Sequence, residues 1–220
     1  MKYRLTDETK VVSGHTLHRI EALKDFADVH KGDKGGFVEG EHNLSQSGNC
    51  WVYDNACVYD RAYVCGSAYV YDSAKVYGSA NVYVSAKVCG SAKVYGSANV
   101  SDSAKVYGSA KVCGRATLCG SAKVYGSAYV YDSAYVCGSA NIQSAADYIY
   151  IKGLGSEYRG TTVFRDRNYG VAVKCGCFLG SLAEFEKQVK ETHGDSKFAA
   201  EYLKLVELIK IHFEIDESSK

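Results

Sequence analysis

The chain has 220 residues and a formal net charge of +1, which argues against a dominant polyanion binder while leaving room for local charged patches. Hydrophobic residues make up 46% of the sequence, enough for a core, but no apolar run reaches the length of a membrane span. No signal-peptide core follows Met1 either. We therefore expect a cytoplasmic, soluble protein that makes no contact with a membrane.

The first 46 residues lack the repeat that follows and mix strand-like pieces with a turn-rich run before Val38. Val38 and Leu44 are six residues apart but out of phase with Val52 and its successors. We interpret residues 1–46 as a separate N-terminal cap that shifts the register before the regular structure begins. A cap is expected because stacked strands expose unpaired backbone groups at an open end.

Residues 47–146 repeat one six-residue phrase, of the form Ser-Ala-Lys-Val-Tyr-Gly, without a single insertion or deletion. An aliphatic residue occupies every sixth position, and a small residue stands two positions before it. An inward pair two apart is the alternation of a strand, and the Gly, Asp and Ser that follow it favour a corner. The aliphatic positions are Val52, Val58, Val64, Val70, Val76, Val82, Val88, Val94, Val100, Val106, Val112, Leu118, Val124, Val130, Val136 and Ile142.

Strands this short cannot bury an apolar face alone, so the units must stack into a solenoid with a shared core. Three hexads per coil would give a triangular prism of about five coils. The repeat resembles the hexapeptide-repeat family of left-handed β-helices. Left-handedness is implied only by that resemblance, because crossovers between parallel strands are otherwise right-handed. The predicted fold class is an all-β solenoid, a triangular left-handed parallel β-helix, with an N-terminal cap and a small C-terminal α+β module.

Five of the nine cysteines occupy the slot directly after the aliphatic residue, where tyrosine usually stands. We interpret them as repeat variants that stay reduced in the cytosol and not as a disulfide framework. Cys119 and Cys137 are eighteen residues apart and should lie on adjacent coils, so a bond between them is geometrically conceivable. The five are Cys65, Cys89, Cys113, Cys119 and Cys137.

Sorting the outward residues by eighteen separates three faces, and the third has smaller side chains and no lysine in its first outward column. This face also has Val84 where other corners have Gly or Asp. We predict that it mediates self-association, as a trimer like many relatives of the fold. The alternative is that this face is simply exposed to solvent. An unaltered native mass of the Val84→Lys variant would favour that alternative. The expected interface residues are Asn81, Tyr83, Val84, Asn99, Ser101, Thr117 and Cys119.

The other two faces place lysine beside tyrosine in outward columns. Stacked lysines repel one another modestly, and the pairing suits a groove for a nucleotide or for single-stranded nucleic acid. Duplication of one repeat explains the same columns without a ligand, and lysine protects a flat β-surface from aggregation, so we favour this second interpretation. The candidate binding residues on the coils are Lys87, Lys105, Lys123, Tyr107 and Tyr125.

The repeat ends at Asp147, and residues 147–220 predict a module of three strands followed by two helices. The strands are expected at 148–152, 161–165 and 171–175. A capping box from Ser181 to Glu184 opens the first helix, and the second is amphipathic from about Ser196 to His212. The module resembles one on uncharacterised phage and prophage hexapeptide-repeat proteins, which implies no established activity. That resemblance rests on Gly153-Leu154-Gly155-Ser156, Arg159, Cys175-Gly176-Cys177-Phe178, Gly180, Phe185 and His193-Gly194-Asp195.

Three residues of the module, Cys175, Cys177 and His193, are weak candidates for zinc ligands, because a lone Cys-x-Cys departs from the usual spacing and lacks a fourth ligand. Residues two apart on a strand point the same way, so we favour simple packing of the two cysteines. The Gly-Leu-Gly-Ser turn with Arg159 could bind a phosphate, but it lacks the lysine of a P-loop. We therefore interpret it as a hairpin turn. We expect no cofactor, and Arg159 and His193 are candidates for contact with a ligand or partner.

The best-known enzymes of the hexapeptide fold are acyltransferases, in which a histidine near the solenoid activates the acceptor. The repeat has no histidine and no extruded loop, whereas His15 and His42 are among those that precede it. We therefore predict a non-enzymatic, oligomeric scaffold that contacts a protein partner. One alternative is a binding protein that sequesters a small nucleotide or a host defence factor, and an acyltransferase comes third.

Overall fold

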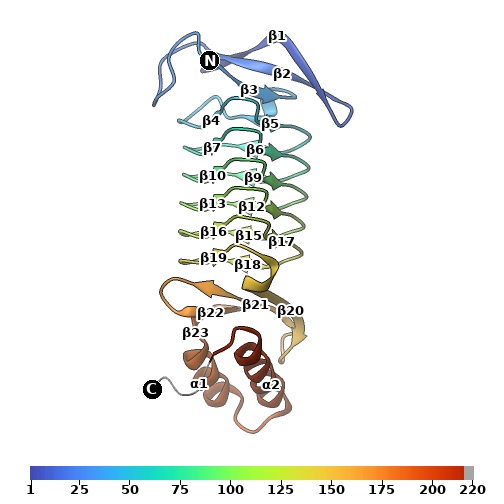
Figure 1. Cartoon of the computed structure of the whole chain (residues 1–220), viewed down its shortest axis with the longest axis vertical. Coiled ribbons are helices and arrows are strands. Elements are labelled where there is room, and N and C mark those ends of the chain that lie inside the picture. Colours follow the sequence, from blue (N-terminus) through green and yellow to red (C-terminus); the bar gives the residue numbers. More distant parts are fainter. Residues whose placement is uncertain (216–220) are drawn as a thin grey trace.

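Residues 1–215 are described by a computed structural model, in which two-residue strands stack into a rod with folded elements at both ends (Figure 1). Each strand pairs in parallel with the strand eighteen residues further on, so the coils form three sheets and confirm the predicted β-solenoid. The strands are β4 (Trp51–Val52), β5 (Cys57–Val58), β6 (Tyr63–Val64), β7 (Tyr69–Val70), β8 (Lys75–Val76), β9 (Asn81–Val82), β10 (Lys87–Val88), β11 (Lys93–Val94), β12 (Asn99–Val100), β13 (Lys105–Val106), β14 (Lys111–Val112), β15 (Thr117–Leu118), β16 (Lys123–Val124), β17 (Tyr129–Val130), β18 (Tyr135–Val136) and β19 (Asn141–Ile142).

The solenoid core consists of the two inward positions of each hexad. Every inward alanine and aliphatic residue from Ala56 to Ile142 has no exposed surface. Burial of each valine contributes roughly 1.5–3 kcal/mol relative to an exposed one. The corners take left-handed backbone conformations, and a Cβ added at Gly96 (φ +70°) would lie 3.0 Å from the amide nitrogen of Gly114 on the next coil. Glycine is therefore favoured at corners by both conformation and space.

The N-terminal segment joins the coils through its third strand. A hairpin of β1 (Tyr3–Val12) and β2 (His15–Ala22) pairs with β3 (Lys34–Val38), and a short 3-10 helix η1 (Glu41–Asn43) follows. Strand β3 is antiparallel to β2 but parallel to β5, with Val38 opposite Val58. This twenty-residue offset, against eighteen in the regular coils, accounts for the expected shift of register.

Lys2 and Tyr3 close the upper end of the core. Lys2 is 1% exposed, and its ammonium donates hydrogen bonds to the carbonyl oxygens of Cys50 (2.8 Å) and Gly48 (3.4 Å). The Tyr3 hydroxyl donates to the carbonyl of Leu44 (2.7 Å). Backbone acceptors at this end of the solenoid thus have partners inside the chain, as buried polar groups require.

The C-terminal module has the three expected strands and one more. They are β20 (Tyr148–Leu154), β21 (Arg159–Asp166), β22 (Gly170–Cys175) and the additional β23 (Phe178–Ser181), in one antiparallel sheet after the 3-10 helix η2 (Ala145–Asp147). The helices α1 (Leu182–His193) and α2 (Lys197–His212) confirm the prediction, and the Ser181 hydroxyl caps α1 by accepting from the Glu184 amide. No helix within residues 1–215 is long and apolar enough to cross a bilayer.

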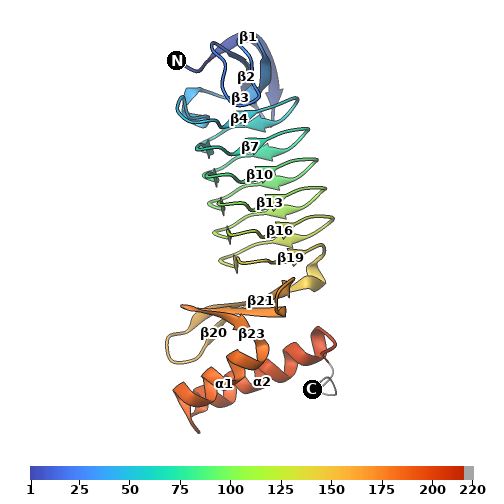
Figure 2. The same cartoon turned by 90° about the vertical axis from the view of Figure 1, so that its left-hand side faces the viewer.

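The module sheet lies between the last coil and the two helices (Figure 2). Side chains on β21 and β22 alternate between the two sides: Phe164 and Ala172 join the solenoid core, whereas Val163 and Val173 pack with the helices. Polar groups on the solenoid side pair with the last coil. The Thr162 hydroxyl accepts from the Tyr135 amide (2.9 Å), so the sheet also caps the lower end of the solenoid.

Candidate functional site

A hollow of about 500 Å³, which we call the module hollow, opens in the C-terminal module. Its apolar lining includes Phe178, Phe185 and Val189, and its polar lining includes Arg159 and His193. The rings of Phe178 and Phe185 lie 5.4 Å apart, and Phe185 meets the Tyr202 ring edge-on at 5.6 Å. An apolar lining with a few convergent polar groups is the usual character of a small-molecule or peptide site.

Four residues that the sequence singles out line the module hollow together. Arg159 begins β21, Cys175 ends β22, Cys177 lies in the β22–β23 turn and His193 ends α1. Secondary-structure prediction gives no reason for these segments to meet. Packing of α1 and α2 on one side of the sheet brings them together.

The Gly-Leu-Gly-Ser turn is packed against α2 through Leu154 and Gly155. The Gly155 amide donates to the Glu201 carboxylate (2.9 Å), and the Tyr202 hydroxyl donates to the Leu154 carbonyl (3.3 Å). Gly155 has φ +73°, and a Cβ there would lie 2.2 Å from the Tyr202 hydroxyl oxygen. Glycine is therefore required at position 155 by both backbone conformation and close contact.

The polar groups of the module hollow differ in how firmly they are held. The Arg159 guanidinium lies beside Gly176 and is 3.6 Å from the Glu157 carboxylate, with its side chain 55% exposed. The His193 ring stacks on Tyr202 at 5.8 Å. Burial raises the pKa of the Tyr202 hydroxyl, so this group stays a neutral donor at physiological pH. The hollow thus presents a solvated cation beside a fixed aromatic wall.

In the part of the chain that the structure describes, Cys175, Cys177 and His193 are not a group whose metal-ligating atoms lie close together. Within residues 1–215, His15, Glu39 and Asp60 do form such a group. Their metal-ligating atoms all lie within 4.8 Å of one another. Cys175 instead accepts a hydrogen bond from the Thr161 hydroxyl (3.2 Å) and lies 3.7 Å from the Tyr202 hydroxyl. These contacts describe a packed thiol.

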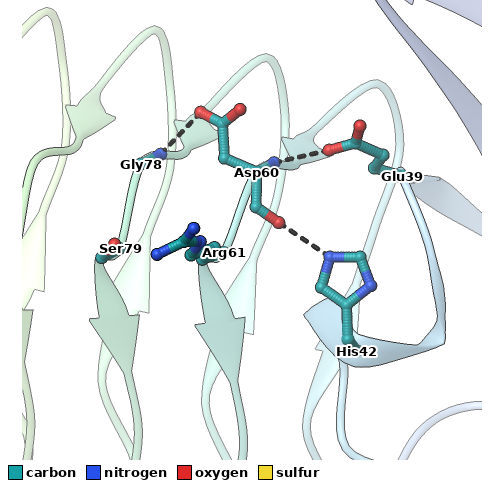
Figure 3. Close-up of a pocket in the computed structure, with 6 residues that line it drawn as sticks. All are labelled: Glu39, His42, Asp60, Arg61, Gly78 and Ser79. Atoms are coloured by element: carbon teal, nitrogen blue, oxygen red, sulfur yellow. Dashed lines mark hydrogen bonds between the residues drawn. The ribbon is translucent and has the colours of Figure 1, made fainter.

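A second hollow of about 480 Å³, the junction hollow, lies where the N-terminal cap meets the first coils (Figure 3). Asp60 is its central residue: the Asp60 amide donates to the Glu39 carboxylate (2.7 Å), and the Asp60 carboxylate accepts from the Gly78 amide (2.9 Å). The Nε2 atom of His42 lies 2.7 Å from the Asp60 carbonyl oxygen. A carbonyl only accepts, so His42 carries a proton on Nε2.

His15 is clamped between two carboxylates beside the junction hollow. Its Nδ1 is 3.0 Å from Glu39 Oε1, and its Nε2 is 3.2 Å from Asp60 Oδ1. The hydrogen bond to Glu39 raises the pKa of His15 and lowers that of Glu39. Because both ring nitrogens face carboxylates, the protonated form of His15 is favoured, and the residue joins cap to coil and is poorly placed to act as a base.

The predicted binding lysines lie in register on one wall of the solenoid. Lys87 pairs with Lys105, and Lys105 pairs with Lys123, on β10, β13 and β16. Within residues 1–215 none of the three makes an ion pair, although the Lys87 ammonium lies 5.5 Å from the Tyr69 ring centre. Tyr107 and Tyr125 stack on each other at 4.9 Å, which leaves no gap between them for a base. Binding of a nucleotide here stays a prediction.

The predicted self-association face is the sheet β18-β15-β12-β9-β6 and its flanking residues. The Asn81 amide donates to the Asn99 side chain (3.3 Å) along this wall. Val84 is 48% exposed at φ +60°, a conformation that a β-branched residue rarely adopts. The other expected members are Tyr83, Ser101, Thr117 and Cys119, and association through them stays a prediction.

Sequence reasoning missed the contacts that build the junction hollow. His15, Glu39 and Asp60 are 24 and 21 residues apart, and nothing in their spacing predicts a contact. Asp60 occupies a corner slot that aspartate also fills at Asp72 and Asp102, so its identity carries no special signal. The antiparallel β1–β2 hairpin decides that His15 reaches this corner.

Comparison with known proteins gives a partial match. No family model matches the chain. The chain is 41% identical over 61 residues to "Uncharacterized acetyltransferase YdcK" of Escherichia coli (strain K12). The match covers 24% of this chain and 19% of that protein, so the chain spans about a fifth of the length of the relative. The likeness to phage and prophage proteins stays a prediction. This partial similarity and the stacked hexads agree with a hexapeptide-repeat β-helix.

Proposed function

We propose that the protein is a rigid β-solenoid rod whose C-terminal module recognises an anionic group carried on an apolar stem, presented by a partner protein or a small metabolite. The observation that carries the proposal is the meeting of Arg159, Cys175, Cys177 and His193 around one apolar hollow. A regular rod without extruded loops separates this module from the N-terminal cap and displays it at one end (Figure 1).

The chemistry of the module hollow favours an anion with an apolar neighbour. Arg159 offers a planar set of donors suited to a carboxylate or a phosphate. Its pairing with Glu157 is solvated at 3.6 Å, so an incoming anion competes against a weak interaction. Phe178 and Phe185 line the same hollow and supply the apolar contact. The anion would therefore accept a pair of charge-assisted hydrogen bonds from Arg159, and its apolar stem would be buried against the phenylalanine rings.

The test is an amide NMR titration of the full chain with two probes, benzoate and phenyl phosphate. We expect saturable shifts at residues 155–159, 175–178 and 188–193. Arg159→Ala should weaken binding about ten- to hundredfold, because it removes charge-assisted hydrogen bonds. Arg165→Ala is the matched control, since Arg165 lies on the same strand but pairs with Asp147 outside the hollow. Equal weakening by both variants, or unshifted amides with both probes, would contradict the proposal.

A second candidate function, acyl transfer in the junction hollow, is favoured by the state of His42. Its Nε2–H is engaged by the Asp60 carbonyl, which leaves Nδ1 as the acceptor nitrogen of the neutral ring. Nδ1 has no hydrogen-bond partner within residues 1–215, and a Cβ at Gly40 would lie 2.8 Å from it. Glycine at position 40 keeps that approach open. The partial relative in Escherichia coli is named as an acetyltransferase, which supports the same reaction class.

In this second candidate, His42 Nδ1 takes the proton of an acceptor hydroxyl or amine as that group attacks a thioester carbonyl. The C–S bond then breaks, coenzyme A leaves as a thiol that takes the proton from His42, and the acyl group stays on the acceptor. We expect His42→Ala to lower acetyl transfer from acetyl-coenzyme A to a panel of amines and alcohols by about a hundredfold or more. His30→Ala is the control, because His30 lies on the exposed part of the cap, 79% exposed. Full activity in His42→Ala, or no transfer by the natural chain, would rule this candidate out.

A further inference from the structure

Cys119 and Cys137 face each other across two adjacent coils, away from both hollows. They directly follow β15 and β18, which pair in register, and the Cys119 amide donates to the Val136 carbonyl (3.0 Å). Parallel neighbours in register lie about 4.8 Å apart, and disulfide-bonded residues have Cα separations of about 4.4–6.8 Å. The Cys119 and Cys137 side chains occupy the same repeat slot on neighbouring coils and interact electrostatically. A bond between the two sulfurs therefore needs little movement of the backbone.

The surroundings of Cys119 favour its thiolate. The Tyr135 hydroxyl lies 3.5 Å from the Cys119 sulfur, and the Lys174 ammonium from β22 lies 5.2 Å from the Tyr135 ring centre. The hydrogen bond from Cys137, helped by Tyr135 and Lys174, outweighs burial and the charge of Asp102 and lowers the pKa of Cys119 to about 6. A lowered pKa makes Cys119 a better thiolate than an ordinary cysteine.

Cys137 has the complementary character. It is 6% exposed, whereas Cys119 is half-buried. Its hydrogen bond to Cys119 and its burial raise the pKa of Cys137, and Asp166 acts in the same direction. Cys137 therefore remains a protonated thiol beside a more accessible thiolate. This division matches an attacking thiol and a resolving thiol.

Other cysteines in the same repeat slot lack these features. The residue eighteen positions after Cys65 is Tyr83, and the one after Cys89 is Tyr107, so neither has a thiol on the next coil. Burial raises the pKa of both Cys65 and Cys89. The two serve as internal controls, because they share the slot and the coil geometry with Cys119.

We propose that Cys119 and Cys137 form a peroxide-reactive dithiol site on the solenoid wall. The Cys119 thiolate attacks one oxygen of a hydroperoxide, the O–O bond breaks, and Cys119 becomes a sulfenic acid as hydroxide or alkoxide leaves. The Cys137 sulfur then attacks the Cys119 sulfur. The S–O bond breaks, the proton of Cys137 leaves with the hydroxyl as water, and a disulfide joins the coils. The peroxide is reduced by two electrons and the two thiols are oxidised.

Two mass-spectrometric measurements on the full chain test this site. At pH 6, iodoacetamide should alkylate Cys119 about tenfold or more faster than Cys65 and Cys89, because its larger thiolate fraction outweighs its lower intrinsic nucleophilicity. One equivalent of hydrogen peroxide should give a Cys119–Cys137 cross-link with loss of two hydrogens. In Cys137→Ser the reaction should stop at a Cys119 sulfenic acid that dimedone traps.

Lys174→Met keeps both thiols and their neighbours on the coils. It should move the midpoint of the pH dependence of Cys119 alkylation upward, while circular dichroism reports an unchanged fold. Alkylation of Cys119 no faster than that of Cys65 and Cys89 would overturn the proposal. So would peroxide treatment that oxidises Cys119 in the natural chain without linking it to Cys137.

Discussion

The free energy of unfolding is expected to fall steeply between pH 10 and pH 11. Tyr3, Tyr59, Tyr148 and Tyr202 are at most 7% exposed, and burial is the largest cause of the raised pKa of each. A group whose pKa is raised by folding contributes stability that is complete below its unfolded pKa, here 10.0, and is lost as the pH rises towards the folded value. At pH 11, Tyr3, Tyr148 and Tyr202, whose pKa values are raised furthest, each remove about 1.4 kcal/mol, and Tyr59 adds to this loss. That loss equals the whole stability of many domains.

Lys2 acts in the opposite direction but is a single group. Burial lowers its pKa from 10.5, so the folded chain gains stability as the pH rises through this range. The measurement is urea unfolding followed by circular dichroism at pH 8, 10 and 11. Tyr148→Phe should reduce the alkaline loss by about a quarter, whereas Tyr158→Phe, at a 62% exposed position, should leave it unchanged. A free energy of unfolding that stays constant to pH 11 would contradict the expectation.

Asp166→Ala is expected to lower the free energy of unfolding by about 3 kcal/mol, because it removes the acceptor for several backbone donors at once. The Asp166 side chain is buried between the module sheet and the last coil. Its carboxylate accepts from the amides of Ser139 (3.0 Å), Asn168 (2.7 Å) and Tyr169 (3.2 Å). Loss of the acceptor leaves the Ser139 amide, at the partly buried contact with the last coil, without a partner, and it releases the turn at Asn168 and Tyr169.

Urea unfolding measures the cost of this change, and hydrogen exchange at the Ser139 and Asn168 amides locates it. Asp166→Asn is the matched variant, since its side-chain oxygen still accepts, and it should cost about half as much or less. Faster exchange should be confined to the lower end of the solenoid and the β21–β22 turn. A cost under about 1 kcal/mol for Asp166→Ala would show that the contact does not hold the module to the coils.

Both ends of the solenoid are closed by the same physical requirement. At the upper end, Lys2 fills the core opening and donates to carbonyls of the first coil. At the lower end, Thr162 and Asp166 accept from amides of the last coil. The two ends need opposite hydrogen-bonding partners because the amides of each coil donate to carbonyls of the following coil, which leaves free carbonyls at the upper end and free amides at the lower end.

The β-solenoid could be predicted from the sequence because the repeat is local and strict. An alanine and a valine two apart, followed by a left-handed corner, describe one short strand and one turn in every hexad. The helices of the module could be predicted equally well, since Ser181 and Ser196 are both N-caps in the structure. Strand β23 was missed because its four residues include Gly180 and run directly into the cap of α1.

The tertiary structure decided which side chains are candidates for a chemical reaction. In the sequence, Cys119 looks like any other variant of the repeat. The lowered pKa of its thiol depends on Cys137 from the next coil and on Lys174 from the module. His42 becomes a candidate base only through the Asp60 carbonyl. The six-residue pattern by itself determined the stacked coils, because pairing of the backbone between coils needs only a repeat of constant length. Pairing of side chains across the ends depended on where the cap and the module dock, which no local pattern encodes.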